Sequence, residues 1–295
     1  MNRSFMAKIA AAFVIILTLQ TLLSGASFKE YFPKGYIDWT NGVINIAARE
    51  QGKSGKLQFG QAYQEAFAEA YKDYISKVKE LINGLRVDEQ TVAGQMLKDN
   101  TVLTSEVERL IERARFNKVQ YGADGSATIH AILPLFGSQG IGSLLVSSKL
   151  GPAVVNEPVE KRNYINFKSE LLRTPDGNLY TGLIVDARAL NLKPALLPKV
   201  LDRKNNIIYG DSSGLAVDTA RDRGTAAYVY SLDEARALKD RIGNHPLVVK
   251  AIFTSGAFQT DVILFNRDAL ILQQANNNLN FLKYAGVVFV LRGKN

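Results

Sequence analysis

The chain has 295 residues, of which 46% are hydrophobic and 22% charged, so it is long enough for two globular domains. It contains no cysteine and two histidines, which excludes disulfides, thiolate metal sites and a cysteine nucleophile, and disfavours a multi-histidine metal site. The formal net charge of +8 is spread along the chain without a basic block. We therefore predict no nucleic-acid partner, and anionic lipid, glycan or peptidoglycan remain candidates.

The first 26 residues have the pattern of a secretory signal peptide. Arg3 and Lys8 form a basic region, Ile9–Leu19 is apolar, and Ser24-Gly25-Ala26 fits cleavage after Ala26. The alternative is an uncleaved anchor, although the apolar run is shorter than the roughly 20 residues of a membrane helix. Cleavage removes Arg3 and Lys8 and leaves a net charge of +6. We expect a periplasmic or outer-membrane-associated protein.

Residues 27–150 are predicted to form an α+β domain. A hairpin is expected where Tyr36–Asp38 and Ile44–Ala48 flank Asn41-Gly42, with Tyr36–Asp38 as a possible sheet edge open to a second copy. Apolar residues recur at helical spacing over Phe59–Leu85, which predicts one long amphipathic helix. Its other face carries lysines and glutamates that suit solvent or a head-to-tail contact.

Two shorter helices and a second hairpin follow. We predict one helix over Glu89–Lys98 capped by Asp88, and another beginning after Ser105, which forms a capping box with Glu108. The strands Phe116–Tyr121 and Ala127–Leu135 are then joined through a glycine turn, and alternation places His130 on the polar face. The expected order is ββαααββ, an antiparallel sheet with helices on one face.

Two glycine-containing stretches resemble nucleotide-binding loops but lack the required spacing. Gln51–Lys56 has no glycine five positions before Lys53, as a P-loop requires. Gly140 and Gly142 are followed by Leu145 where a dinucleotide fingerprint has Gly or Ala, so we expect a turn out of the domain there. No cofactor-binding or metal residues are predicted.

Residues 151–178 are predicted to be a linker, and residues 179–295 a mixed-sheet α/β domain. Its centre is Thr181–Ala187, a short β-branched run typical of a strand that is buried on both faces. Pro194 and Pro198 exclude a helix or central strand between them. The remaining expected elements are a Lys199–Leu201/Asn206–Tyr209 hairpin, a solvated Asp218–Arg223 loop, strands Ala226–Tyr230, Leu247–Phe253, Thr260–Phe265 and Gly286–Leu291, a helix opened by a Ser231/Glu234 capping box, and a helix capped by Asn266.

Asp186 is the one carboxylate at a position where α/β folds place ligand groups, at the end of the predicted central strand. Arg188 follows two residues later and is expected to share its face. A general acid or base needs a partner and a perturbed environment, and the sequence identifies neither. We therefore predict no catalytic residues and a structural role for Asp186.

Five stretches together resemble the LPP-twenty lipoprotein-like family of Gram-negative envelope proteins: GYIDWTNGVINIAA, INGLRVDEQT, VERLIERARF, HAILPLFG and YTGLIVDARALNLKPALLPKVLD. The first four cover the N-terminal domain, and the last resembles a C-terminal extension of some members. The resemblance implies an envelope protein that assembles rather than catalyses, since relatives build flagellar basal-disk or outer-membrane rings. This chain departs from the lipoproteins because, without cysteine, it has no covalent lipid anchor.

We therefore expect a non-enzymatic exported envelope protein that acts by weak self-assembly or by binding an envelope partner, with a flagellar role as one candidate process. An anionic glycan- or peptidoglycan-binding module is the first alternative, and it rests on the net charge. A carboxylate-dependent hydrolase using Asp186 or another carboxylate is the second.

Overall fold

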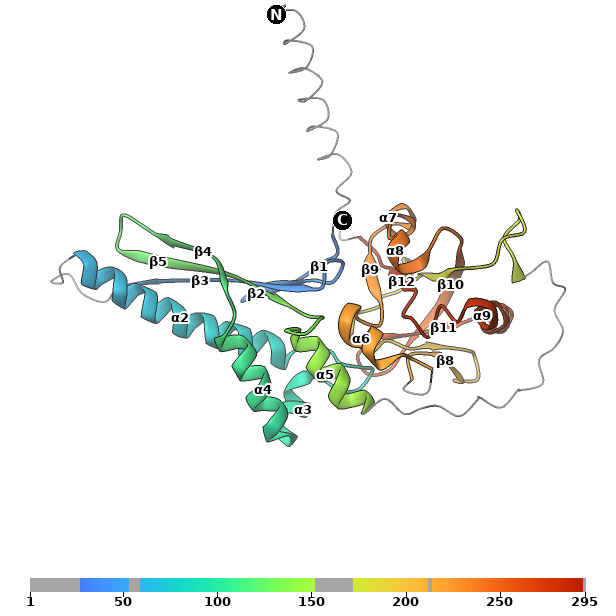
Figure 1. Cartoon of the computed structure of the whole chain (residues 1–295), viewed down its shortest axis with the longest axis horizontal. Coiled ribbons are helices and arrows are strands. Elements are labelled where there is room, and N and C mark those ends of the chain that lie inside the picture. The colour runs from blue at the N-terminus through green and yellow to red at the C-terminus, as the bar shows by residue number, and fades with distance from the viewer. Residues whose placement is uncertain (1–26, 53–58, 152–171, 212–213, 294–295) are drawn as a thin grey trace, which may run out of the picture.

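The computed structural model describes residues 27–52, 59–151, 172–211 and 214–293, which form two sheet-centred parts (Figure 1). The predicted signal peptide, most of the Gln51–Lys56 loop and most of the linker lie outside these residues. No helix within the described ranges is both long and apolar enough to cross a membrane.

The N-terminal part contains a five-stranded, fully antiparallel sheet in the order β1-β2-β3-β5-β4. The predicted turn at Asn41-Gly42 is confirmed, since Gly42 has φ +63° between β2 and β3. Tyr36–Asp38 is an inner strand and not an edge, because residues 29–32 pair alongside it. The strands are β1 (Lys29–Phe32), β2 (Gly35–Asp38), β3 (Val43–Gln51), β4 (Phe116–Tyr121) and β5 (Ser126–Pro134).

The predicted long helix is confirmed as α2 (Phe59–Asn83), which runs along one face of β3 and β5 (Figure 1). Its inner stripe is fully buried and consists of Ala66, Ala70, Tyr74 and Val78. Inward residues of the strands alternate with exposed ones, so this helix covers one face of the sheet and leaves the other open.

The next two helices begin at residues other than those predicted. α3 (Ala93–Asp99) starts late because the Asp88 carboxylate accepts hydrogen bonds from the N–H groups of Gln90 and Thr91 and makes a turn. α4 (Thr101–Glu112) starts early because Asn100 caps it through the N–H of Leu103, at 3.0 Å. Ser105 lies inside α4 and donates its hydroxyl to the Thr101 carbonyl oxygen.

The glycines after β5 begin another helix, where we had expected a turn out of the domain. Gly137 takes φ +89°, and α5 (Ile141–Leu150) follows. A side chain at Gly140 or Gly142 would collide with the Leu135 carbonyl oxygen, so the close return of the chain requires glycine. The observed order is thus βββαααββα, with β1 and α5 added to the predicted elements.

The C-terminal part is a seven-stranded mixed sheet in the order β8-β7-β11-β10-β6-β12-β9. The predicted central strand is confirmed, because β6 pairs in parallel with both β10 and β12 and its Leu183, Ile184 and Val185 are fully buried. The strands are β6 (Gly182–Asp186), β7 (Val200–Leu201), β8 (Ile207–Tyr209), β9 (Ala227–Val229), β10 (Pro246–Ser255), β11 (Asp261–Leu264) and β12 (Val287–Val290).

Within the described residues, four helices accompany this sheet. The Ser231/Glu234 capping box is confirmed at the start of α7, whereas the predicted solvated loop at Asp218–Arg223 is wrong because residues 217–223 form α6. Asn266 does not cap its helix: Phe265 is the cap residue, and Asn266 Oδ1 accepts from the N–H of Arg203 at 3.3 Å. The helices are α6 (Val217–Arg223), α7 (Leu232–Ala237), α8 (Lys239–Ile242) and α9 (Asn266–Leu279).

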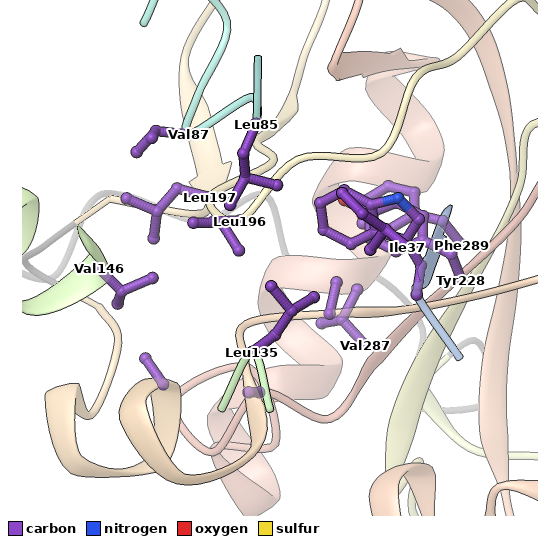
Figure 2. Close-up of a cluster of buried hydrophobic side chains, with 14 of the residues drawn as sticks. Ile37, Leu85, Val87, Leu135, Val146, Leu196, Leu197, Tyr228, Val287 and Phe289 are labelled. Atoms are coloured by element: carbon purple, nitrogen blue, oxygen red, sulfur yellow. The ribbon is translucent and has the colours of Figure 1, made fainter. Parts of the chain in front are cut away.

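The two parts share one continuous hydrophobic core (Figure 2). The loop between Pro194 and Pro198 docks on the N-terminal part, where the N–H of Leu197 donates to the Val87 carbonyl oxygen at 2.7 Å. In Figure 2 the side chains of Leu196 and Leu197 lie among Leu85, Val87 and Val146 of the N-terminal part. The two expected domains therefore pack against each other through a shared hydrophobic core.

Candidate ligand-binding hollow

The open face of the N-terminal sheet has a hollow over the four neighbouring strands β2, β3, β5 and β4. This hollow, which we call the sheet hollow, has a volume of about 570 Å³. It is lined by the β1–β2 turn and β2 (Pro33, Lys34, Gly35, Tyr36), by β3 (Asn45, Ile46, Ala47), by β4 (Asn117, Lys118, Gln120), by β5 (His130, Ala131, Ile132) and by Lys77 of α2.

Sheet register brings these residues together from distant parts of the sequence. Asn45 lies opposite Tyr36 on β2 and opposite Ile132 on β5. In the neighbouring row His130 lies opposite Lys118 on β4. Residues opposite each other in an antiparallel sheet point to the same face, so each row adds side chains to the hollow.

The sheet hollow is basic. Its lining includes three lysines and His130, and none of the described lining residues is an acid. Among the three lining lysines, Lys77 alone pairs with a carboxylate of the described residues, because its Nζ lies 2.6 Å from Asp73 Oδ2. Lys34 and Lys118 are exposed. An anionic group entering the hollow therefore meets cations without having to displace an acid from the lining.

Amide and aromatic groups complete the surface. His130 Nε2 lies 3.2 Å from Gln120 Oε1, so this part of the polar face is ordered by a hydrogen bond. Beside the hollow the rings of Tyr31 and Tyr36 lie 5.4 Å apart, and Lys29 Nζ lies 5.3 Å from the centroid of the Tyr36 ring. Such a surface offers hydrogen bonds, ring faces and positive charge, which suits binding more than bond cleavage.

A second polar cluster lies between the two parts, with Asp261 buried and Glu89 and Lys199 half-buried. Lys199 Nζ contacts Glu89 Oε1 at 2.6 Å, while the backbone N–H of Lys199 donates to Asp261 Oδ1 at 3.0 Å. Burial, together with the smaller effect of the nearby Glu89 charge, raises the pKa of the Asp261 carboxyl to about 7 against the opposing hydrogen bond from Lys199. Glu89 Oε2 is buried without a hydrogen-bond partner. Lys199 thus contacts both acids, Glu89 through its ammonium group and Asp261 through its backbone N–H.

Asp186 lies at the end of β6, as predicted, and is bound by Arg188. Arg188 Nε and Nη2 donate to the two carboxylate oxygens at 2.9 and 2.8 Å. These hydrogen bonds hold the pKa of Asp186 below its usual range. The carboxylate therefore has the arrangement of a structural ion pair. No group of three or more acidic or histidine side chains suited to a metal ion occurs in the described ranges.

The sequence alone did not reveal the sheet hollow. Alternation correctly placed His130 on the polar face, but β1 was not recognised, and the remaining lining residues are distributed over four strands. The Glu89–Lys199–Asp261 cluster left no sequence signal, because its members are far apart in the chain and belong to different parts.

A protein-family model described as the second domain of Treponema pallidum Tp0624 matches residues 182–293. The matched range begins at β6 and includes the whole C-terminal sheet, so the C-terminal part is similar to that domain. No curated protein matches the chain. The resemblance to the LPP-twenty lipoprotein-like family remains a prediction.

Proposed function

We propose that this chain is a non-enzymatic, exported envelope protein that works by binding an anionic partner in the sheet hollow. The observation that carries the proposal is the basic lining of this open sheet face, with Lys34 and Lys118 exposed and no acid among the described lining residues. The bound state of Asp186 favours a binding role over the hydrolase alternative.

Export is supported by the signal-peptide pattern of residues 1–26, and it implies a periplasmic or outer-membrane-associated site of action. N-terminal sequencing of the protein from fractionated cells tests it. We expect a chain that begins at Ser27 in the envelope fraction. A chain that keeps Met1 and is found in the cytoplasmic fraction would contradict the proposed localisation.

Binding is tested with two anionic probes, poly-L-glutamate and polygalacturonate. The double variant Lys34→Glu/Lys118→Glu reverses two exposed charges in the hollow, and we expect at least one probe to bind about 10-fold more weakly to it. The matched control is Lys204→Glu/Lys239→Glu, which makes the same change in net charge at exposed lysines of the C-terminal part. Equal losses in both variants would show binding to net charge alone and would overturn the site.

Salt gives an independent readout of the same interaction. Raising the ionic strength from 0.1 to 1 M shortens the screening length from about 10 Å to about 3 Å, so binding at exposed lysines should weaken steeply. Binding that is unchanged in high salt would contradict a charge-driven partner.

An anionic glycan is an alternative occupant of the sheet hollow. The Tyr31 and Tyr36 ring pair beside Lys29 favours it, since ring faces and cations commonly contact sugars that carry acids. The two probes separate the alternatives, because a glycan site prefers polygalacturonate and a peptide site prefers poly-L-glutamate.

Self-association is the second candidate function. α7 and α8 pack against β6, β9 and β12, whereas Val248 and Phe253 of β10 remain 41% and 60% exposed. An uncovered apolar sheet face favours a protein contact. Two other features predicted from the sequence do not support self-association. Residues 36–38 are not an edge, and Lys72, Lys77 and Lys79 of α2 pair with Glu69, Asp73 and Glu108. Sedimentation at high concentration, comparing the wild type with Phe253→Lys, tests this candidate.

A further inference from the structure

The central strand of the N-terminal sheet, β3, is longer than its neighbour β2, and this difference makes a step in the sheet. β3 is nine residues long, but β2 pairs with it only over Val43–Ile46. β5 pairs with β3 over its whole length on the other side. Residues 47–51 of β3 therefore extend beyond the end of β2, and this unpaired edge adjoins the sheet hollow at Lys34 and Ala47.

The backbone groups of this edge have a defined direction. Gly42 accepts from Leu135 on the β5 side, and Gly52 donates to Gly125 on the same side. In an antiparallel ladder successive residues point to opposite sides, so even-numbered residues of β3 face β5 and Ala47, Arg49 and Gln51 face away. Among the described residues, no strand pairs with Arg49 or Gln51 on that side.

Lys77 occupies the beginning of the edge. Its Nζ donates to the Ala47 carbonyl oxygen at 3.1 Å, which is the direction that the alternation assigns to this oxygen. A lysine placed against a free strand edge protects it from indiscriminate pairing. The contact also shows that the Ala47 carbonyl oxygen can accept a hydrogen bond from a group other than a neighbouring strand.

We propose that the Ala47–Gln51 edge of β3 is a strand-addition site for an extended acidic segment of a protein partner. The inference rests on the proposed function, because the same partner enters the sheet hollow. An added strand would match the unpaired donors and acceptors, which repeat about every 6.8 Å along β3.

The surroundings set the chemistry of the segment. Arg49 is exposed but already pairs with Asp124, so the free positive charge that an added strand meets on the open face is Lys34, at the end of the step. Acids at alternate positions of the segment are therefore favoured, with small or β-branched residues toward the flank of α2.

The probe is a nine-residue peptide that alternates glutamate and valine, and its control is the same peptide with N-methyl groups on the residues that would face β3. Both peptides have the same charge and side chains, but the control lacks the backbone donors that pair with β3. We expect the unmethylated peptide to bind more tightly and to slow amide hydrogen exchange at Arg49 and Gln51. Equal affinity of the two peptides, or protection only at other amides, would overturn strand addition.

A pair of variants tests the same edge from the protein side. Arg49→Pro removes the outward N–H and leaves the β5 side intact, since proline is tolerated on an edge position, whereas Arg49→Ala keeps the N–H. Relative to Arg49→Ala, we expect Arg49→Pro to bind the peptide about 2- to 10-fold more weakly, which corresponds to one hydrogen bond. Circular dichroism confirms that both variants fold. Equal binding by the two folded variants would contradict the proposal.

The outcomes separate this inference from the proposed function. If both peptides bind equally and Lys34→Glu/Lys118→Glu weakens both, the hollow binds anions without strand addition. If only polygalacturonate binds, the partner is a glycan and the edge proposal is overturned. If no anionic probe binds, both proposals are overturned.

Discussion

Arg86 and Glu30 form a close ion pair where the two parts of the molecule meet. Arg86 Nη2 lies 2.5 Å from Glu30 Oε1 and 2.6 Å from Oε2, and both side chains are largely buried. Arg86 Nε also donates to the Pro194 carbonyl oxygen at 2.8 Å. One guanidinium therefore links β1 and the docking loop of the C-terminal part to the segment that follows α2.

Arg86→Ala should lower the free energy of unfolding by about 2–4 kcal/mol, because it leaves the Glu30 carboxylate inside without its cation. Chemical denaturation measures this. Arg49→Ala is the matched control, since Arg49 pairs with Asp124 on the surface and should change stability by less than about 1 kcal/mol. Similar values for the two variants would contradict a structural role for the Arg86–Glu30 pair.

Asp261 should make the protein less stable as the pH rises from about 4 to about 7. Its carboxyl has a pKa near 7 in the folded chain and 3.8 when exposed, so the folded state holds the proton more tightly. The resulting stabilisation is complete below the unfolded pKa and is lost as the pH passes the folded pKa. The expected slope is at most about 1.4 kcal/mol per pH unit.

Asp261→Asn isolates this effect, because the amide cannot ionise but can still accept the hydrogen bonds from Lys199 and Thr260. Urea denaturation at pH 5 and pH 8 should show a larger stability difference for the wild type than for the variant. The facing charged groups, Glu89 and Lys199, remain in both proteins. Identical pH profiles would show that Asp261 does not hold a proton in the folded state.

Lys199→Met should destabilise the chain, by about 2–4 kcal/mol, because the half-buried Glu89 then remains beside Asp261 without a cation and with one oxygen fully buried. The double variant Lys199→Met/Glu89→Gln should recover part of the loss, since the unpaired charge is removed. A double-mutant cycle from denaturation curves gives the coupling. Additive effects would mean that the two side chains act independently.

Tyr228→Phe should cost about 1–2 kcal/mol of stability. The buried Tyr228 hydroxyl bonds both the N–H and the carbonyl oxygen of Ala195, at 3.1 and 2.9 Å, and so fixes the docking loop. Burial also raises the pKa of this hydroxyl, so it stays protonated. Chemical denaturation measures this cost. Tyr121→Phe, at an exposed ring, is the control and should leave the denaturation midpoint unchanged.

Local patterns in the sequence predicted much of the fold. The helical stripe of α2, the turn at Asn41-Gly42 and the capping box at Ser231 each depend on neighbouring residues, and all three are present. The predicted first residue of α4 was wrong, because Asn100 and not Ser105 caps this helix. The short strand β1 lacks alternation of its own and is fixed by its pairing with β2.

The candidate site was harder to predict from the sequence, because it depends on the pairing of distant strands. His130 was placed correctly because its strand alternates, but the rows that join it to Lys118, and Asn45 to Tyr36, follow from register between strands far apart in sequence. The raised pKa of Asp261 likewise depends on burial between the two parts. Such features follow from packing that sequence periodicity does not encode.

Site-specific photo-crosslinking in cells that make the protein tests partner binding most directly. A photoreactive residue at Asn45 lies in the sheet hollow, and one at Tyr284 lies on an exposed position of the C-terminal part. We expect a discrete adduct from position 45 that disappears in the Lys34→Glu/Lys118→Glu background and is absent from position 284. No adduct from position 45, or an adduct that persists after charge reversal, would contradict binding of an anionic partner in the hollow.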